Sequence, residues 1–582
     1  MHRIFPNCSA ILGPKAREAW QISYGTKLIL PIPTLYHNIS SINSKVDPNL
    51  YPCTYGTFST ICLTVSRLPP GSEGAVRDVA EAYRTIPLHH SQWPGLVVRL
   101  PEEDSFAVDT AFCFGFGPSA GIYGNVADAG ADIFRAKGLG PLSKWVDDHI
   151  FFRIRKVHLA DYNHQRALWA TEIAANSNPV LDGGRKWFKG ALMPNDSAEE
   201  FDEDASRPIL DLSSASPRSA EDSLFSYCMD DIDTLSARLG IPWEKSKDIP
   251  FSSHPTFLGF VWDLQNKTVS LSKHKQTKYL AAVASWQGSR THVLLEVQKL
   301  HGKLLHASLI IPEGRAYLTN LERCLGIYQD NPFMPRTPPH QTKDDIQWWQ
   351  NILSGPILSR PVPGPCTVHN FHAYSDASSG HGIGITIKGW WRAWVLLPGW
   401  NHDDRDIGWA ESIGFEMLVR SILHTEASGI TFKVFGDNWG VIEGWWKGRS
   451  RNRACNNVFR RVHRLLANSS CTVLTRYIPS AHNPADGPSR GIYPPTSLLL
   501  PPIPIPSEIQ PFIADIHFPS PSYSPDPAPL AATRQPSTQP FHCVGNNPNL
   551  SQRPSQHHAF NTHELERQGE ECPQATKIGL HP

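Results

Sequence analysis

The chain has 582 residues, enough for three or four domains that each bury a core of their own. Lys plus Arg and Asp plus Glu both number 54, so no global field marks a nucleic-acid binder and any such surface must be local. The 11 cysteines are scattered without CxxC or zinc-knuckle spacing, which argues against structural zinc and a disulfide framework and for a reducing compartment.

Residues 1–37 carry apolar patches without a clear period and stay unassigned. The first residues lack the apolar core of a signal peptide, and no apolar run reaches the roughly 18 residues of a membrane span. We therefore expect a soluble, intracellular protein, in the cytoplasm or the nucleus, with no membrane partner. Short strands and turns are expected from residue 38 to residue 70.

Residues 75–88 predict a strand that ends at Asp78, followed by a helical turn that presents Tyr83 on the same side. A further strand is expected over residues 95–100. Asp78 could equally be a helix N-cap, and Tyr83 a buried core tyrosine.

Aromatic residues and glycines alternate over residues 112–121 and lead into a helical pattern over residues 122–136. Because glycine has no side chain, the glycines around Phe116, Gly117 among them, would let the backbone approach a flat ligand closely. A tight turn in the core would have the same pattern.

Apolar runs on both sides of Asp147 and Asp148 predict two buried strands joined by a tight turn, with the acids at its tip. An ordinary Asp-Asp hairpin turn is the alternative. Together with Asp78 they make three carboxylates on strand ends, the arrangement that two Mg²⁺ ions need for in-line phosphoryl or nucleotidyl transfer. Charges among so much apolar surface are costly unless a cation shares the site.

The chain turns polar and acidic over about residues 176–222, which we interpret as a solvated insertion without a site. A helix is expected over residues 231–239, followed by Lys245 and by an apolar segment that contains Leu258 and Gly259.

Amphipathic helices with repeated lysines are expected over residues 264–325, and this pattern suits a grip on duplex phosphates or an ordinary solvated helix face. The proposed contacts are Lys273, Lys275, Lys278 and Lys303. Residues 326–365 are interrupted by prolines and resemble a connection.

A second set of acids follows. Asp376 ends a strand, and Asp437 follows a strand over residues 431–436. Glu411 leads a helix over residues 412–424, although Glu416 could also head its apolar face, and Asp486 opens a C-terminal helical turn. Strands are also expected over residues 382–387 and 390–397.

A basic run between these acids is either a solvated face or a surface for a nucleic-acid hybrid: Lys447, Arg449, Arg451 and Arg453. After residue 491 the chain is rich in Pro and Ser, and we expect a disordered tail.

Three segments resemble the palm motifs of reverse transcriptases in order and spacing: Asp78-x-x-x-Ala82-Tyr83, the Phe116-Gly117 segment, and Trp145-Val146-Asp147-Asp148, with Trp in place of the more usual Tyr. The resemblance implies that Tyr83 is a steric gate that selects deoxynucleotides. It further implies that Lys245 is a general acid near the pyrophosphate and that Leu258-Gly259 is a primer grip.

The second set of acids resembles the ribonuclease H active site, and His482-Asn483-x-Ala485-Asp486-x-x-Ser489-Arg490 is typical of its retroelement branch. The whole chain is most similar to the reverse transcriptase–ribonuclease H region of DIRS-like, tyrosine-recombinase-type retrotransposons. The implied partners are an RNA template, a DNA primer, an RNA/DNA hybrid and dNTPs.

The resemblance implies an α+β multidomain fold in which a right-hand polymerase precedes a mixed α/β ribonuclease H-like domain. The implied units are fingers and palm (38–263), thumb (264–325), connection (326–365), ribonuclease H-like domain (366–490) and tail (491–582). Two Mg²⁺ (or Mn²⁺) ions per site would be held by Asp78, Asp147 and Asp148, and by Asp376, Glu411, Asp437 and Asp486.

Some residues depart from the family pattern. Arg77 stands where an apolar strand residue is usual, the second motif lacks its Leu-Pro opening, and residues 1–37 offer few basic residues for a triphosphate. A degenerate remnant that binds nucleic acid without catalysis is therefore an alternative. An RNA-templated RNA polymerase is a third interpretation, against which Tyr83 and the attached nuclease argue.

Overall fold

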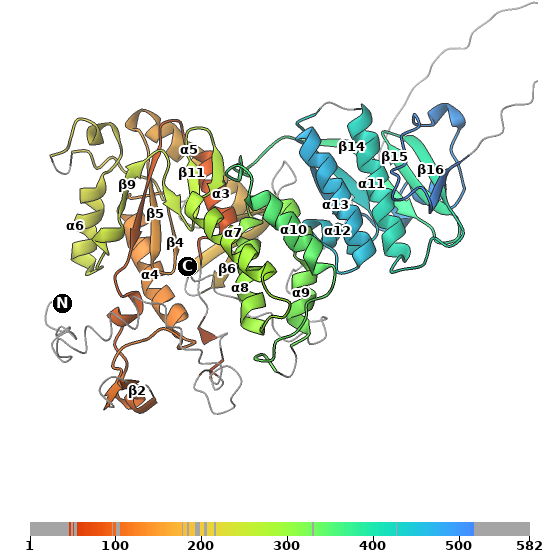
Figure 1. The fold of residues 1–582 in the computed structure, drawn as a ribbon. Coiled ribbons are helices and arrows are strands. Elements are labelled where there is room, and N and C mark those ends of the chain that lie inside the picture. Colours follow the sequence, from red (N-terminus) through yellow and green to blue (C-terminus); the bar gives the residue numbers. More distant parts are fainter. Residues whose placement is uncertain are drawn as a thin grey trace, which may run out of the picture.

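The protein is described here from a computed structural model that covers, between residues 43 and 516, residues 43, 46–47, 50–51, 55–95, 97–100, 105–176, 179–182, 185–192, 198–202, 207–214, 217–328, 331–425 and 428–516. The predictions for residues 1–37 and for the chain beyond residue 516 lie outside these ranges. Helices and sheets are mixed along the chain, and in Figure 1 a cluster of helices lies between two sheet-containing units. Within the described ranges, no helix is both long and apolar enough to cross a bilayer.

The first unit is built on a four-stranded antiparallel sheet with the order β4-β5-β1-β9. Its strands are β1 (Glu73–Asp78), β4 (Leu142–Trp145), β5 (Asp148–Arg153) and β9 (Ile249–Ser252). Ile150 and Phe152 enter one core cluster and Phe151 enters another, because successive side chains of a strand point to opposite faces. The continuous apolar run after Asp148 thus reflects a strand that is buried on both faces.

Helices and short turns surround this sheet: α3 (Phe58–Arg67), η4 (Ala82–Thr85), η5 (His90–Gly95), α4 (Ser119–Ala136), α5 (Lys156–Asn176), η7 (Asp222–Leu224), α6 (Met229–Leu239) and η8 (Lys245–Lys247). The helices predicted over residues 122–136 and 231–239 are confirmed as α4 and α6. The strand predicted over residues 95–100 is β2 (Val97–Leu100), which pairs with β3 (Ser105–Val108).

The acidic insertion contains more regular structure than its composition indicated. Strands β6 (Pro179–Asp182), β7 (Arg185–Leu192) and β8 (Ala198–Asp202) form a small antiparallel sheet. Trp187 and Phe188, which have high strand propensity, lie in its central strand.

The middle unit combines a second four-stranded sheet with four helices. The sheet has the order β10 (Thr256–Phe257), β11 (Phe260–Asp263), β12 (Thr268–Leu271) and β13 (Ser359–Pro361). The helices are α7 (Lys273–Gln287), α8 (Leu294–Ala307), α9 (Thr319–Gly326) and α10 (Thr342–Leu353), and η9 (Pro312–Tyr317) lies between α8 and α9.

The predicted connection over residues 326–365 is not a separate unit. Ile346, Trp349 and Leu353 of α10 belong to the same core cluster as the buried residues of α7 and α8, and β13 extends the sheet of β12. The prolines suggested a linker, but the apolar face of α10 joins this segment to the helices before it.

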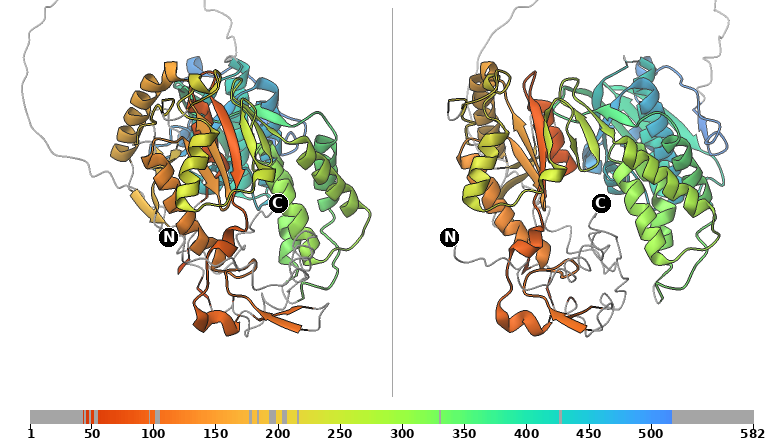
Figure 2. Two further views of the ribbon diagram at one scale, coloured as in Figure 1. Left: turned by 90° about the vertical axis from the view of Figure 1, so that its left-hand side faces the viewer. Right: turned by 60° about the vertical axis from the view of Figure 1, so that its left-hand side comes forward.

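The last unit is a six-stranded mixed sheet with the order β18-β17-β14-β15-β16-β19. Its strands are β14 (Val368–Ala377), β15 (Gly382–Ile387), β16 (Trp390–Leu396), β17 (Thr431–Gly436), β18 (Thr472–Tyr477) and β19 (Ile513–Asp515). The helices and turns of this unit are α11 (Ile407–Thr425), α12 (Trp439–Trp446), α13 (Arg453–Ser469), η10 (Ser480–His482), α14 (Asp486–Ser489) and η11 (Thr496–Leu498). The strands predicted over residues 382–387, 390–397 and 431–436 are confirmed, and Figure 2 shows this unit from two further directions.

The disordered tail was predicted to begin too early. Residues 491–516 are packed: the Leu500 amide donates to the Trp391 carbonyl at 2.8 Å, and β19 pairs with the edge of β16. Three isoleucines of this segment are buried in the core of the last unit: Ile503, Ile509 and Ile513. Proline is tolerated in an extended segment along a sheet edge, so proline content did not exclude packing here.

Candidate active sites

Strand register brings the first three carboxylates to one end of the first sheet. Asp78 is the cross-strand partner of Asp148, and Val146 with Asp147 forms the two-residue turn between β4 and β5. Val146 has a left-handed backbone (φ 57°), as a tight hairpin turn requires of its first central residue. Two strand ends and a hairpin tip therefore carry these acids.

Negative charge is concentrated at this end of the sheet. The pKa of Asp148 is raised to about 7, first by burial and then by the charges of Asp147 and Asp78, while Lys247 and Lys275 act in the opposite direction. Burial also raises the pKa of Tyr123, helped by Asp147 and Asp78. The site would accommodate cations.

The structure places Lys247, and not the predicted Lys245, against Asp78. The Lys247 ammonium forms an ion pair with Asp78, and this hydrogen bond is the main reason that the pKa of Lys247 is raised. Lys245 is exposed, two residues earlier in the short turn η8. The sequence shows both lysines, but only the pairing of residues 242–244 with residues 78–80 decides which one reaches Asp78.

Tyr83 lies beside the second motif. Its ring is buried, with its centroid 4.9 Å from that of Phe114 and 5.9 Å from that of Tyr123. Phe116 packs partly buried against the same core cluster, while Gly117 is exposed and donates its amide to Asn43 Oδ1 at 2.8 Å. Tyr83 and this segment are therefore neighbours, as both alternatives for Tyr83 require.

The Leu258-Gly259 turn faces the helices of the middle unit. Both residues have positive φ (54° and 82°), and His306 Nε2 is 2.9 Å from the Leu258 carbonyl oxygen. A Cβ on Gly259 would lie 2.8 Å from Lys275 Cε, so the lysine stem packs where a side chain would be. Because Lys275 also lowers the pKa of Asp148, the turn lies near the first carboxylates.

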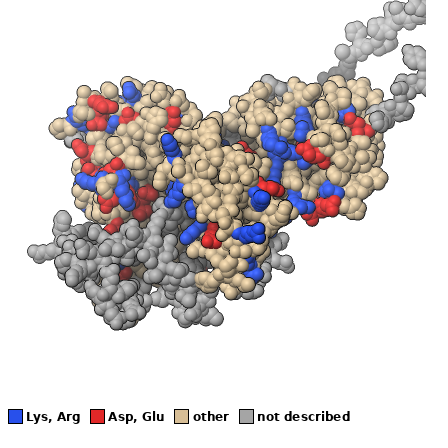
Figure 3. Space-filling view, in the orientation of Figure 1, with Lys and Arg blue, Asp and Glu red and all other residues tan. Residues whose placement is uncertain are grey.

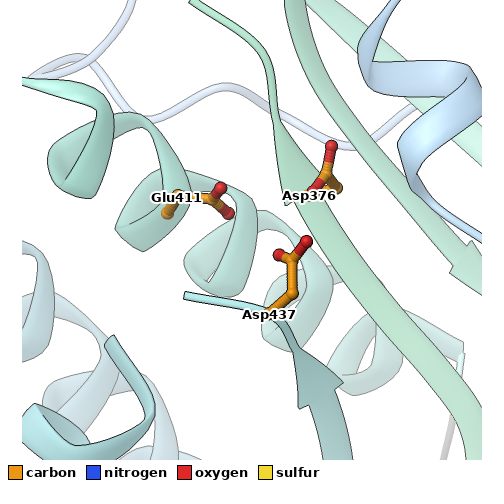
Figure 4. A group of neighbouring side chains, drawn as sticks. All are labelled: Asp376, Glu411 and Asp437. Carbon is orange, nitrogen blue, oxygen red and sulfur yellow. The ribbon is translucent and has the colours of Figure 1, made fainter. Parts of the chain in front are cut away.

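The second set of acids converges more closely. Asp376 lies on β14, Glu411 on α11 and Asp437 directly after β17, and Figure 4 shows all three pointing toward one another. One ligand atom of each lies within 4.8 Å of the others. Since β14 and β17 are parallel neighbours, their acids meet at one sheet edge. Among the residues with described positions, Asp78, Asp147 and Asp148 do not reach the same closeness.

The surroundings of this trio fit a divalent cation. The pKa of Asp376 is raised to about 7 and that of Glu411 to about 9, first by burial and then by the neighbouring carboxylates, Asp437 among them. The buried Oδ1 of Asp437 has no hydrogen-bond partner among the described atoms. Hard cations such as Mg²⁺ prefer such carboxylate oxygens.

The C-terminal motif, residues 482–490, makes hydrogen bonds to Asp376 and to its neighbour Ser375 but adds no fourth carboxylate to the trio. The Ser489 hydroxyl donates to Asp376, and Asn483 Nδ2 donates to the Ser375 carbonyl at 3.0 Å. Asp486 lies outside the trio and accepts from Arg490 Nε at 2.8 Å, although its charge still contributes to the raised pKa of Asp376. Sequence reasoning missed the positioning roles of Asn483 and Ser489.

The structure separates the two rival glutamates of α11. Glu416 is fully buried and binds Arg461 Nη2 at 2.6 Å and Arg420 Nη2 at 2.8 Å. Glu411 faces Asp376 and Asp437 instead. Two arginines therefore already neutralise Glu416.

The predicted basic contacts divide into two groups. Lys273 is exposed and Lys278 half-buried, while Lys303 donates to the Lys299 carbonyl at 3.3 Å. The run after α12 is paired within the protein: Lys447 with Glu443 at 2.6 Å, Arg449 with Glu322 at 3.0 Å and Arg453 with Asp404 at 3.5 Å, while the Arg451 carbonyl accepts from Arg323.

These pairings change the interpretation of the run. Arg449 and Arg451, through their contacts with Glu322 and Arg323, join the last unit to α9, whereas Lys447 and Arg453 pair within the last unit. Figure 3 shows acidic side chains interspersed with the basic ones on the visible face.

No protein-family model and no curated protein sequence matches the chain. Among solved structures, a foamy viral protease-reverse transcriptase in complex with RNA/DNA hybrid aligns with a TM-score of 0.29 and 12% identity, over 69% of this chain and 44% of that one. The foamy viral protease-reverse transcriptase in complex with dsDNA gives the same score and identity, over 70% of this chain and 68% of that one. RNase H1 from the archaeon Halobacterium salinarum NRC-1 aligns with a TM-score of 0.18 and 18% identity, over 21% of this chain and 97% of its own. The chain thus spans less than half of the first of these structures.

Proposed function

We propose that the chain is an RNA-directed DNA polymerase with an attached ribonuclease H activity, and that it acts inside the cell in the replication of a retroelement. The observation that carries the proposal is the presence of two separate carboxylate clusters, each at the end of its own sheet. The group that we propose is the DIRS-like retrotransposons, on the sequences of the Trp145-Val146-Asp147-Asp148 box, of the residues around Asp78 and of the segment Leu304-Leu305-His306-Ala307-Ser308.

At the first site, Asp78, Asp147 and Asp148 would hold two Mg²⁺ (or Mn²⁺) ions, which would activate a primer hydroxyl and neutralise the leaving pyrophosphate. Lys247, next to Asp78, is the candidate proton donor to that leaving group. Tyr83 would exclude a ribose 2′-hydroxyl from an incoming dNTP. The Leu258-Gly259 turn would hold the primer end.

At the second site, Asp376, Glu411 and Asp437 would hold the metal ions, with Asp486 at the rim, and the RNA strand of a hybrid would be hydrolysed. Ser489 keeps Asp376 oriented through its hydroxyl. The high pKa of Glu411 means that this carboxyl must lose a proton when a cation binds.

The test is a pair of assays on the full chain: Mg²⁺-dependent primer extension on an RNA template, and cleavage of an RNA/DNA hybrid. Asp148→Asn should abolish extension and spare cleavage, and Asp437→Asn should do the reverse. The assignment of two independent sites fails if either change removes both activities from a protein that remains folded.

A second candidate is a remnant that binds nucleic acid without catalysis. It is favoured by two observations. Lys247 already neutralises Asp78, and the first three carboxylates lie less close together than the second set does. Binding of hybrid without extension or cleavage by the wild-type chain would select this candidate.

A further inference from the structure

Arg77 is a charged residue in the middle of the first core. Its side chain is fully buried on β1, next in sequence to Asp78. A buried guanidinium is costly unless it is fully paired. Arg77 meets this condition with Asp248, with Asp233 of α6 and with the ring of Trp243, 4.9 Å from its central carbon.

The contact with Asp248 is bidentate. Arg77 Nε is 3.2 Å from Asp248 Oδ1, and Nη2 is 2.7 Å from Oδ2. Two hydrogen bonds from one guanidinium to one carboxylate fix the relative orientation of the two groups as well as the distance between them. Asp248 immediately follows Lys247, so two consecutive residues of β1 hold two consecutive residues of this segment: Arg77 holds Asp248, and Asp78 holds Lys247.

Backbone hydrogen bonds fix the other end of the segment. The Glu244 amide donates to the Asp78 carbonyl at 2.8 Å, and the Ala80 amide donates to the Pro242 carbonyl at 2.7 Å. Between these bonds and Asp248 there is only the three-residue turn η8. The Lys247 side chain is itself 65% exposed, and an ion pair this exposed adds little restraint of its own.

We infer that Arg77 is a positioning residue, which holds Lys247 against Asp78 by fixing Asp248. This inference rests on the proposed function for the role of Lys247 in the reaction, whereas the restraint of the segment stands on contacts alone. It also explains why an arginine replaces the apolar residue expected before Asp78: the buried charge anchors a second segment of chain at the site.

Asp248→Asn and Asp233→Asn form a matched pair for the test. Each makes the same chemical change at an acid bound to Arg77, and each leaves Arg77 the other acid and Trp243. Only Asp248 adjoins Lys247. Hydrogen exchange of the full chain, followed by peptide, should show faster exchange over residues 244–248 in Asp248→Asn than in Asp233→Asn, with residues 142–153 unchanged in both. Equal exchange over residues 244–248 in the two variants would contradict the inference that Asp248 restrains this segment, whether or not the protein has polymerase activity.

A double-mutant cycle tests whether Asp248 acts through Lys247. Asp248→Asn should lower the maximal rate of primer extension about ten-fold, the order expected for a misplaced catalytic group, with little change in KM for primer–template. In a Lys247→Met background, Asp248→Asn should lower the maximal rate by less than about two-fold, because the ammonium group that Asp248 positions is absent. Asp233→Asn should stay within about two-fold in either background.

Fully additive effects of Asp248→Asn and Lys247→Met would overturn the positioning role. If the wild-type chain extends no primer, the proposed function fails. The exchange experiment still shows whether Asp248 restrains residues 244–248. The two failures are therefore distinguishable.

Discussion

Replacing Glu411 with Gln removes a carboxyl that is buried beside Asp376 and Asp437. The pKa of Glu411 is about 9, against about 4.3 for an unfolded glutamate. A pKa raised by folding means that the folded state binds the extra proton, so this group destabilises the metal-free protein increasingly as pH rises from about 4 toward about 9. At pH 7 the cost is about 4 kcal/mol, and Glu411→Gln should recover much of this loss of stability.

The matched change Glu416→Gln, five residues along the same helix, should act in the opposite direction. Glu416 is fully buried between Arg461 and Arg420, and removing one partner of a buried pair costs about 3–5 kcal/mol because it leaves charge uncompensated. With about 2–4 °C of melting temperature per kcal/mol for a unit of this size, the melting temperatures of the two variants should differ by roughly 10–30 °C.

Scanning calorimetry of the full chain at pH 7 in EDTA measures both variants under the same conditions. Hybrid cleavage below the melting temperature separates stability from chemistry: Glu411→Gln should lose cleavage, and Glu416→Gln should keep it. If Glu411→Gln lowers the melting temperature, or if both variants shift in the same direction, the electrostatic contrast between the two glutamates is wrong.

Three further outcomes are expected. Lys247→Met should slow primer extension by about 10²-fold while Lys245→Met stays within about two-fold, and the reverse order would return the proton-donor role to Lys245. In EDTA the melting temperature should fall between about pH 4 and pH 7, because the folded-state pKa of Asp148 and of Asp376 is about 7, well above that of an unfolded aspartate. Mg²⁺ should flatten that slope, and a flat profile in EDTA would contradict the raised pKa values. A chain ending at residue 490 should melt lower than one ending at residue 516, by calorimetry, because it loses three buried isoleucines worth about 1.5–3 kcal/mol each; equal melting would show that the segment contributes nothing.

Local patterns predicted the acids that follow buried strands, because an apolar run and the acid after it are adjacent in sequence. Asp78, Asp148, Asp376 and Asp437 all lie at strand ends, and register then brings them together. Local patterns could not show whether Glu411 or Glu416 belongs to the second set of acids. Five residues turn a helix by about 140°, so the two face different neighbours, and the sheet and the arginines that decide between them come from elsewhere in the chain.

Long-range partners explain the remaining differences. The run that contains Arg449 was predicted to be a surface for a nucleic-acid hybrid or a solvated face, and nothing near Arg449 in the sequence shows that Glu322 pairs with it. Lys245 and Lys247 look equivalent until residues 242–244 pair with residues 78–80. Composition likewise predicted a disordered tail after residue 491. The isoleucines that lie between its prolines were the sequence signal that part of this segment packs against the last unit.

The short strand β19 has a consequence for solution behaviour. Strand β16 spans seven residues and carries Trp391 and Trp394, and without β19 one of its edges would offer unpaired backbone groups to another chain. The three residues of β19 cover part of that edge and end the sheet with a strand too short to be an effective template for intermolecular pairing. The segment that composition predicted to be a disordered tail thus protects this edge against edge-to-edge aggregation, and copies that lack it should self-associate as their concentration rises.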